Sequence, residues 1–155
     1  MLDLLIPTIA QGLLWSLLAL GVYITFRVLD IADLSVEGTF PLGAAVAATC
    51  ITSGHSLVTA FVLAVLAGCV AGAVTGLLTT KLKIPALLSG ILTMIGLYSI
   101  NLRVMGRANL SLLGQTTIYS WGASAGLTEA QTTLAVGLIA ALLVVAVVYW
   151  FFGTE

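Results

Sequence analysis

The chain has 155 residues, of which 61% are hydrophobic and 7% are charged, and its mean hydropathy is +1.22. So few polar side chains cannot cover a water-soluble core, which excludes a soluble globular protein. The formal net charge of −1 and the lack of a Lys/Arg cluster argue against nucleic-acid binding, since nucleic acid is held through many phosphate contacts. The composition therefore predicts an integral membrane protein.

Continuous apolar runs favour membrane helices over a β-barrel, whose strands show alternating polarity. Five helices are expected, at Leu4–Leu29, Thr39–Ser53, Leu57–Thr80, Ala86–Leu102 and Thr132–Phe152. The second is short and has Pro41 at its predicted start, where a missing N–H costs nothing. The N-terminus has no positive region and no small-residue cleavage site, so we expect the first helix to remain in the protein.

The few charges predict the orientation of the helices. Arg27 ends the first helix and Lys81 and Lys83 end the third, which places both ends in the cytoplasm by the positive-inside rule. Arg103 and Arg107 favour the opposite arrangement. We predict an outer N-terminus and an inner C-terminus, because the alternative would export Arg27 and both lysines.

The first connection carries four charges, Arg27, Asp30, Asp33 and Glu37, at three- and four-residue steps. They would share one face if this segment were helical. An Arg–carboxylate network there could act as an inner gate or a proton relay, because ionisable groups in membranes usually have a function. A solvated turn at the membrane surface is the alternative interpretation.

The third helix carries Gly68, Gly72 and Gly76, each four residues from the next. Residues four apart share a face, so these glycines form a groove that another backbone can approach closely. We therefore expect Gly72 to pack against another helix. A groove that lines a pore is the alternative.

The fourth helix carries a weakly polar stripe of small residues, Ser89, Thr93 and Gly96. Such a stripe can line a water-filled path, and we predict that it borders the translocation path. The alternative is structural, because Ser and Thr hydroxyls also bond to carbonyls one turn earlier or across a helix pair.

A long connection from Arg103 to Gln131 separates the last two helices. A connection of this length usually folds onto something or binds something. Its Arg103, Arg107, Tyr119 and Trp121 are suited to contact with a second protein, whereas the two aromatic residues also fit an interfacial belt.

No pattern of an enzyme or a metal site stands out. His55 is the single histidine, and the chain has no Gly-x-Ser-x-Gly elbow. Cys50 and Cys69 fall in apolar runs, where a thiol usually behaves as a small hydrophobe. We expect no cofactor, no metal, no disulfide and no catalytic residue.

Three early stretches, residues 12–23, 29–38 and 42–47, resemble permease subunits in the branched-chain amino acid and ribose group of ABC importers. In that group an Ala-Leu/Val-Gly helix is followed by an Ile-Asp-Leu-Ser-Val-Gly turn and a small-residue helix. Here Asp33-Leu34-Ser35-Val36 is followed by Glu37 before Gly38. This variant is most similar to the branch associated with uptake of tryptophan or other amino acids.

The resemblance implies the first half of a type II importer permease in the plasma (cell inner) membrane. It implies a pore of paired permease subunits that is driven by separate cytoplasmic ATPase subunits, and this sequence accordingly has no Gly-x-x-x-x-Gly-Lys-Ser/Thr motif. It also implies an extracytoplasmic binding protein that delivers a small solute such as an amino acid. Family members continue into a cytoplasmic coupling helix, so we expect truncation before it, near Glu155. The alternative is a self-contained oligomeric carrier that uses Arg27, Asp30, Asp33 and Glu37 for ion coupling.

Overall fold

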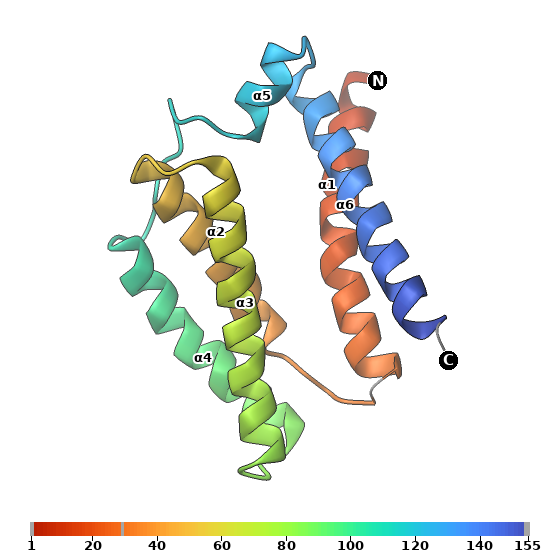
Figure 1. The fold of residues 1–155 in the computed structure, drawn as a ribbon, viewed down its shortest axis with the longest axis vertical. Coiled ribbons are helices and arrows are strands. Elements are labelled where there is room, and N and C mark those ends of the chain that lie inside the picture. The colour runs from red at the N-terminus through yellow and green to blue at the C-terminus, as the bar shows by residue number, and fades with distance from the viewer. Residues whose placement is uncertain (1, 29, 154–155) are drawn as a thin grey trace. The chain divides into compact units, whose positions relative to one another are not determined.

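The computed structural model describes residues 2–28 and 30–153, and every regular element in that part of the chain is helical. Figure 1 shows the elements in chain order. They are α1 (Leu2–Tyr23) with the π-helix η1 (Ile24–Val28), α2 (Val36–Thr52), α3 (Leu57–Thr80), α4 (Ala86–Met105), α5 (Ile118–Ser124) and α6 (Glu129–Phe152). The all-helical membrane fold expected from the sequence is confirmed.

Four candidate membrane spans occur among the described residues: Leu5–Arg27, Leu57–Thr80, Ala86–Met105 and Glu129–Trp150. The remaining long helix, α2, is apolar but has only 17 residues. At about 1.5 Å per residue it is shorter than the hydrocarbon layer of a typical bilayer, which is about 30 Å thick.

Local signals explain several helix boundaries. The predicted and observed bounds of α3 agree, and the Ser56 side chain caps its first turn by accepting a hydrogen bond from the Thr59 N–H. Helix α6 begins three residues before the predicted Thr132, because Thr128 and Gln131 form a reciprocal capping box. Helix α4 extends to Met105 and ends at Gly106, whose φ of 66° is left-handed.

Other boundaries differ more from expectation. Helix α2 begins at Val36 instead of Thr39, so Pro41 is inside the helix and cannot donate to the carbonyl of Glu37 four residues earlier. The first predicted helix changes to a π-helix after Tyr23, and its expected last residue, Leu29, lies outside the described residues. The long connection also contains α5, which the sequence patterns did not predict.

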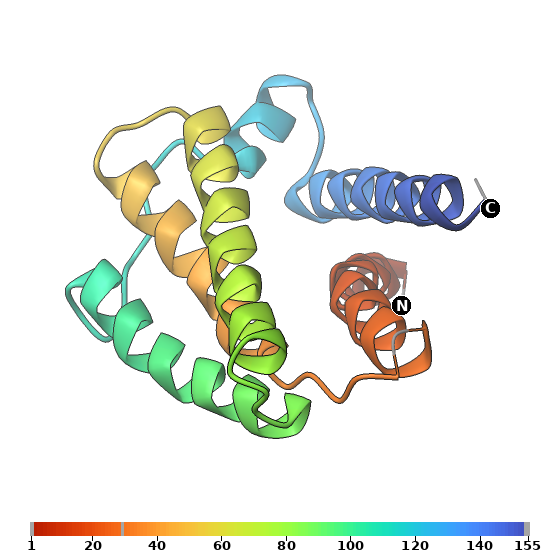
Figure 2. The same ribbon diagram turned by 60° about the horizontal axis from the view of Figure 1, so that its bottom comes forward.

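The chain divides into two compact units, which we describe separately. In the first, which runs to Gly21 and resumes at Ile118, α1 and α6 lie side by side and run in the same direction (Figures 1 and 2). A Cβ added at Gly137 of α6 would lie 3.2 Å from the Cβ of Leu13 in α1. Helix α5 packs on α6, where Thr132 occupies the space that a side chain at Gly122 would need.

The second unit, residues 22–117, contains α2, α3 and α4. Its buried core joins Leu42 of α2, Ala71 of α3 and Leu97 of α4. Most other large apolar side chains are exposed, among them Phe61 on α3 and Tyr98 on α4. Such a surface suits contact with lipid or with other membrane helices.

Candidate functional site

The turn that precedes α2 is seated on α4. The Asp33 carboxylate accepts a hydrogen bond of 2.8 Å from the Ser35 N–H, and the Ser35 side chain is buried. Below this turn lies Gly90 of α4, where an added Cβ would be 2.8 Å from the Leu34 nitrogen. That distance is too short for a real Cβ contact, so the turn can approach α4 only because residue 90 is glycine.

Helices α2 and α4 then stay in close contact along their lengths. A Cβ added at Gly38 would lie 2.9 Å from the Cα of Met94, so the two backbones nearly touch at this point. Further along, the Thr49 hydroxyl lies 3.3 Å from the Val104 carbonyl oxygen, to which it donates. The two helices therefore run in the same direction.

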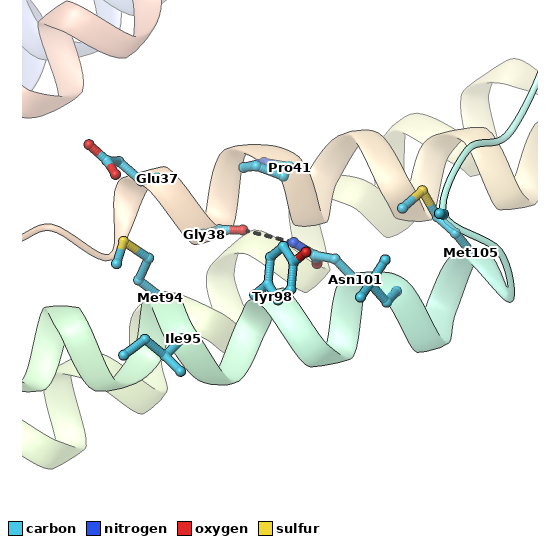
Figure 3. A pocket seen from close by; sticks show the side chains of 10 residues that line it. Glu37, Gly38, Pro41, Met94, Ile95, Tyr98, Asn101 and Met105 are labelled. Atoms are coloured by element: carbon cyan, nitrogen blue, oxygen red, sulfur yellow. Dashed lines mark hydrogen bonds between the residues drawn. The ribbon is translucent and has the colours of Figure 1, made fainter.

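A groove of about 670 Å³ lies between α2 and α4 (Figure 3). Its lining is mostly apolar and includes Pro41 and Tyr98. Asn101 lies on its floor with 6% of its surface exposed, and its Nδ2 donates to the Gly38 carbonyl at 3.4 Å. The other amide atom, Oδ1, is buried and has no hydrogen-bond partner within the described part of the chain.

Hydroxyl groups join α3 to α4 on another face of α4. The Thr79 and Ser89 hydroxyl oxygens are 2.6 Å apart, and the Thr75 hydroxyl donates to that of Thr93 at 2.9 Å. Ser89 and Thr93 also donate to carbonyls of their own helix, at Ala86 and Ser89 respectively. The buried hydroxyls of Thr75, Ser89 and Thr93 therefore all have hydrogen-bond partners.

The three residues predicted to border the translocation path differ in how exposed they are. Ser89 is fully buried and Thr93 nearly so, whereas Gly96 is exposed and a Cβ there would meet nothing within 4 Å. The burial of the two hydroxyls favours the helix-packing alternative. That the stripe borders a path in an assembled permease stays a prediction.

The four charges of the first connection do not share a helix face. Arg27 belongs to η1 and Glu37 to the first turn of α2, but residues 30–34 between them are not helical. Asp30 has a left-handed φ of 52°, and Asp33 stabilises the turn through Ser35. The geometry is that of an irregular turn, which is the alternative interpretation; a role at an inner gate stays a prediction.

Gly68, Gly72 and Gly76 have no close neighbour in the described chain, since a Cβ added at any of them would meet nothing within 4 Å. That Gly72 packs against another helix therefore stays a prediction. The glycines with close contacts in this unit are Gly38 and Gly90, which the sequence analysis did not single out as packing positions.

The expected docking residues are divided between the two units. Arg103 and Arg107 are exposed at the end of α4, in residues 22–117. Tyr119 and Trp121 lie on α5 and are about half exposed, and the Tyr119 hydroxyl accepts a hydrogen bond of 3.4 Å from Thr133 of α6. Their role in binding a second protein stays a prediction.

Sequence analysis also missed Asn101, which follows Thr93 by eight residues and is buried like it. The signal that could have found it is its polarity within an otherwise apolar span, because polar groups in membrane helices need partners and often mark functional positions.

Several apolar helices of spanning length, joined by buried hydroxyl contacts and glycine-mediated approaches, define a multi-pass membrane protein. A family model described as "Branched-chain amino acid transport system / permease component" matches residues 4–154, and the chain belongs to this family. It is thus part of a transport permease and not an enzyme, as the sequence predicted.

Two curated relatives are similar to the chain. A "Tyrosine transport system permease protein" of Clostridioides difficile (strain R20291) is 51% identical over 108 residues, which cover 70% of this chain and 37% of the relative. "Uncharacterized protein RP368" of Rickettsia prowazekii (strain Madrid E) is 41% identical over 119 residues, which cover 77% of this chain and 42% of the relative. The chain thus spans about two fifths of these relatives. No solved structure matches it.

Proposed function

We propose that the chain forms part of the membrane pore of an ABC importer for an amino acid, with tyrosine or a close aromatic analogue as the solute. The observation that carries this proposal is the 51% identity to a protein named as a tyrosine transport permease. The segment from Asp33 to Gly38 supports it, because its sequence resembles ABC importer permeases and its first residues, which precede α2, lie against Gly90 of α4.

The proposed assembly contains a second permease subunit, as a homodimer, together with cytoplasmic ATPase subunits and an extracytoplasmic binding protein. The exposed apolar side chains of α3 and α4 support contacts with further helices or lipid. The unpartnered glycine groove of α3 supports close approach of another helix.

Uptake by the reconstituted full-length permease, its ATPase and its binding protein tests this function. Radiolabelled tyrosine should enter proteoliposomes only when ATP and the binding protein are both present. Ionophores that collapse proton and sodium gradients should leave the initial rate unchanged. Uptake that follows an ion gradient without ATP would instead support the ion-coupled carrier, and the permease proposal would be wrong.

We propose that the binding protein contacts the exposed side chains of Arg103, Arg107, Tyr119 and Trp121. Exposed Arg and aromatic side chains are the types most often found at the centre of protein interfaces. Replacing Arg103, Arg107 and Trp121 together with Ala should reduce crosslinking to the binding protein and tyrosine uptake. If both stay at the parent level, the aromatic residues serve only the interfacial belt.

A further inference from the structure

The mostly apolar groove between α2 and α4 contains a few hydrogen-bond acceptors. Asn101 Oδ1 has no partner in the described structure, and Pro41 deprives the Glu37 carbonyl of its usual helical donor. Glu37 also brings a carboxylate to one end of the groove, where its side chain is exposed and points away from Asn101 (Figure 3). It is the one charged side chain among the described residues that line the groove.

Such a groove is unsuited to lipid tails. A buried amide oxygen without a donor is unfavourable in protein and more so beside hydrocarbon, where no water can reach it. The apolar lining and the volume of about 670 Å³ instead match small-molecule pockets, which combine hydrophobic walls with a few placed polar groups.

A single rotation of the side-chain amide of Asn101 allows it to accept a hydrogen bond from a ligand in the groove. Its bond to the Gly38 carbonyl is 3.4 Å long, near the limit for a hydrogen bond, and is correspondingly weak. A half-turn of the amide exchanges Nδ2 with Oδ1 and brings two oxygens next to each other. This arrangement is stable only if a donor in the groove bonds to both oxygens, and a group with several N–H bonds and a positive charge does so best.

We propose that the α2/α4 groove binds the ammonium group of the transported amino acid, through Asn101 Oδ1 and the Gly38 carbonyl. This inference rests on the proposed function for the identity of the solute. The Glu37 carboxylate attracts the cationic group to the end of the groove. The solute's apolar or aromatic side chain then packs on Pro41, Tyr98 and their neighbours.

Substitutions at Asn101 separate ligand binding from helix packing. In the assembled full-length permease, Asn101→Leu removes both the acceptor and the donor, whereas Asn101→Asp removes the amide donor and keeps two acceptor oxygens. Losing a hydrogen bond to a charged group should raise KM for tyrosine about tenfold or more in Asn101→Leu. Asn101→Asp should keep KM near the parent value. Asn109→Leu, at an exposed position outside the groove, is the matched control and should leave KM unchanged.

A purely structural Asn101 would behave differently. Both substitutions would then lower membrane abundance to a similar extent with KM unchanged, since both remove the donor to Gly38. That result would overturn the proposal, as would a parent-like KM in an abundant Asn101→Leu variant.

A labelling experiment tests the site without relying on uptake or on the binding protein. With Cys50 and Cys69 replaced by Ser, an Ile95→Cys variant places a thiol on the groove. Its reaction with a small water-soluble thiol reagent should be slowed by tyrosine and by tyramine, which has the ammonium but no carboxylate. The deaminated acid 3-(4-hydroxyphenyl)propionate should not protect, and adding Asn101→Leu should abolish protection.

The labelling outcomes also distinguish this inference from the proposed function. Protection by tyramine supports the ammonium site even if ATP-driven tyrosine uptake is not found. Normal tyrosine uptake with no protection by either amine overturns the site and leaves the function intact. A thiol that never reacts shows that lipid or another protein segment fills the groove, which also overturns the proposal.

Discussion

At the scale of single residues, regular spacing does not identify the glycines of the second unit, residues 22–117, that allow close packing. Gly68, Gly72 and Gly76 have the regular spacing that sequence analysis detects, yet an added Cβ at each meets nothing within 4 Å. Gly38 and Gly90 have no such repeat, but each lies against a backbone of a neighbouring segment. Spacing identifies residues that share a face, whereas only the fold shows which face has a neighbour.

A substitution at Gly90 should measure this contact. Gly90→Ala brings a Cβ to 2.8 Å from the Leu34 nitrogen, so the turn must move away from α4. Overpacking of this kind typically costs about 1–3 kcal/mol. We expect a lower midpoint for thermal unfolding of the purified protein in detergent.

Gly96→Ala is the matched control for this experiment, because it lies on the same helix and its Cβ would meet nothing. Alanine favours a helix over glycine by roughly 0.5–1 kcal/mol, so this variant should unfold at the parent midpoint or above. Equal destabilisation by both substitutions would show that the turn is not held tightly against α4.

At the scale of elements, the sequence predicts best those helices that have clear capping or terminating residues at their ends. Helix α3 lies between Ser56, which caps it, and Lys81, and its bounds were predicted correctly. The Thr128–Gln131 capping box can be recognised in the sequence, but the expectation of a connection up to Gln131 places the start of α6 three residues late. Helix α5 is only seven residues long and is stabilised by Gly122 against Thr132, a tertiary contact that no local pattern encodes.

The candidate site was less predictable than the helices. The stripe of Ser89 and Thr93 was recognised, but its partners Thr75 and Thr79 belong to another helix. Hydroxyl spacing cannot show whether a stripe faces water or a second set of hydroxyls. Asn101 was missed because its significance comes from burial and an unsatisfied oxygen, which depend on α2 as well as α4.

The Thr75–Thr93 contact predicts a measurable coupling between α3 and α4. Thr75→Val and Thr93→Val each remove one hydroxyl and leave the other without its cross-helix partner. Because the second substitution then removes a hydroxyl that has already lost its cross-helix bond, the double variant should be less destabilised than the sum of the two. Hydrogen bonds between membrane helices have coupling energies of about 0.6 kcal/mol on average. Additive losses in a double-mutant cycle of unfolding would contradict this contact.

Thr93→Trp distinguishes the two interpretations of the Ser89, Thr93 and Gly96 stripe. If the stripe borders the translocation path, the bulky indole should block tyrosine uptake at normal membrane abundance, and a Ser89→Cys variant should react with water-soluble thiol reagents. If it only packs α3 on α4, Thr93→Trp should lower abundance because Thr93 is buried. Normal uptake together with an unreactive Ser89→Cys variant would exclude the path.

The exposed glycine groove of α3 leads to a prediction about a partner beyond the described chain. Gly72→Leu should cost roughly 1–3 kcal/mol in the assembled permease, because a side chain there would overpack the helix that we expect to lie in the groove. Val70→Leu, on the exposed surface of the same helix, is the control. If both variants accumulate and melt like the parent assembly, the glycines face lipid.

At the scale of the whole molecule, the contacts of the second unit bear on the direction of its helices. The turn before α2 meets Gly90 near the start of α4, and Thr49 near the end of α2 bonds to Val104 near the end of α4. Helices α2 and α4 therefore run in the same direction, and α3, which connects them in the sequence, runs in the opposite direction, as alternating spans require. Asp33 and the lysines that follow α3 lie at one end of this unit, and His55 lies at the other.

Which end faces the cytoplasm follows from charge, and accessibility labelling tests it. Lys81 and Lys83 should stay inside, since translocating basic residues near a span is disfavoured. In a cysteine-free background, a thiol at His55 or Ala123 should react with a membrane-impermeant reagent added to intact cells, and one at Lys83 should react only after permeabilisation. His55 and Lys83 lie in short connections next to helices, so the two positions differ mainly in the side of the membrane. If only Lys83→Cys is labelled in intact cells, the orientation is the reverse of the one predicted. Arg103 and Arg107 would then lie inside, and the proposed contact with an outer binding protein would be excluded.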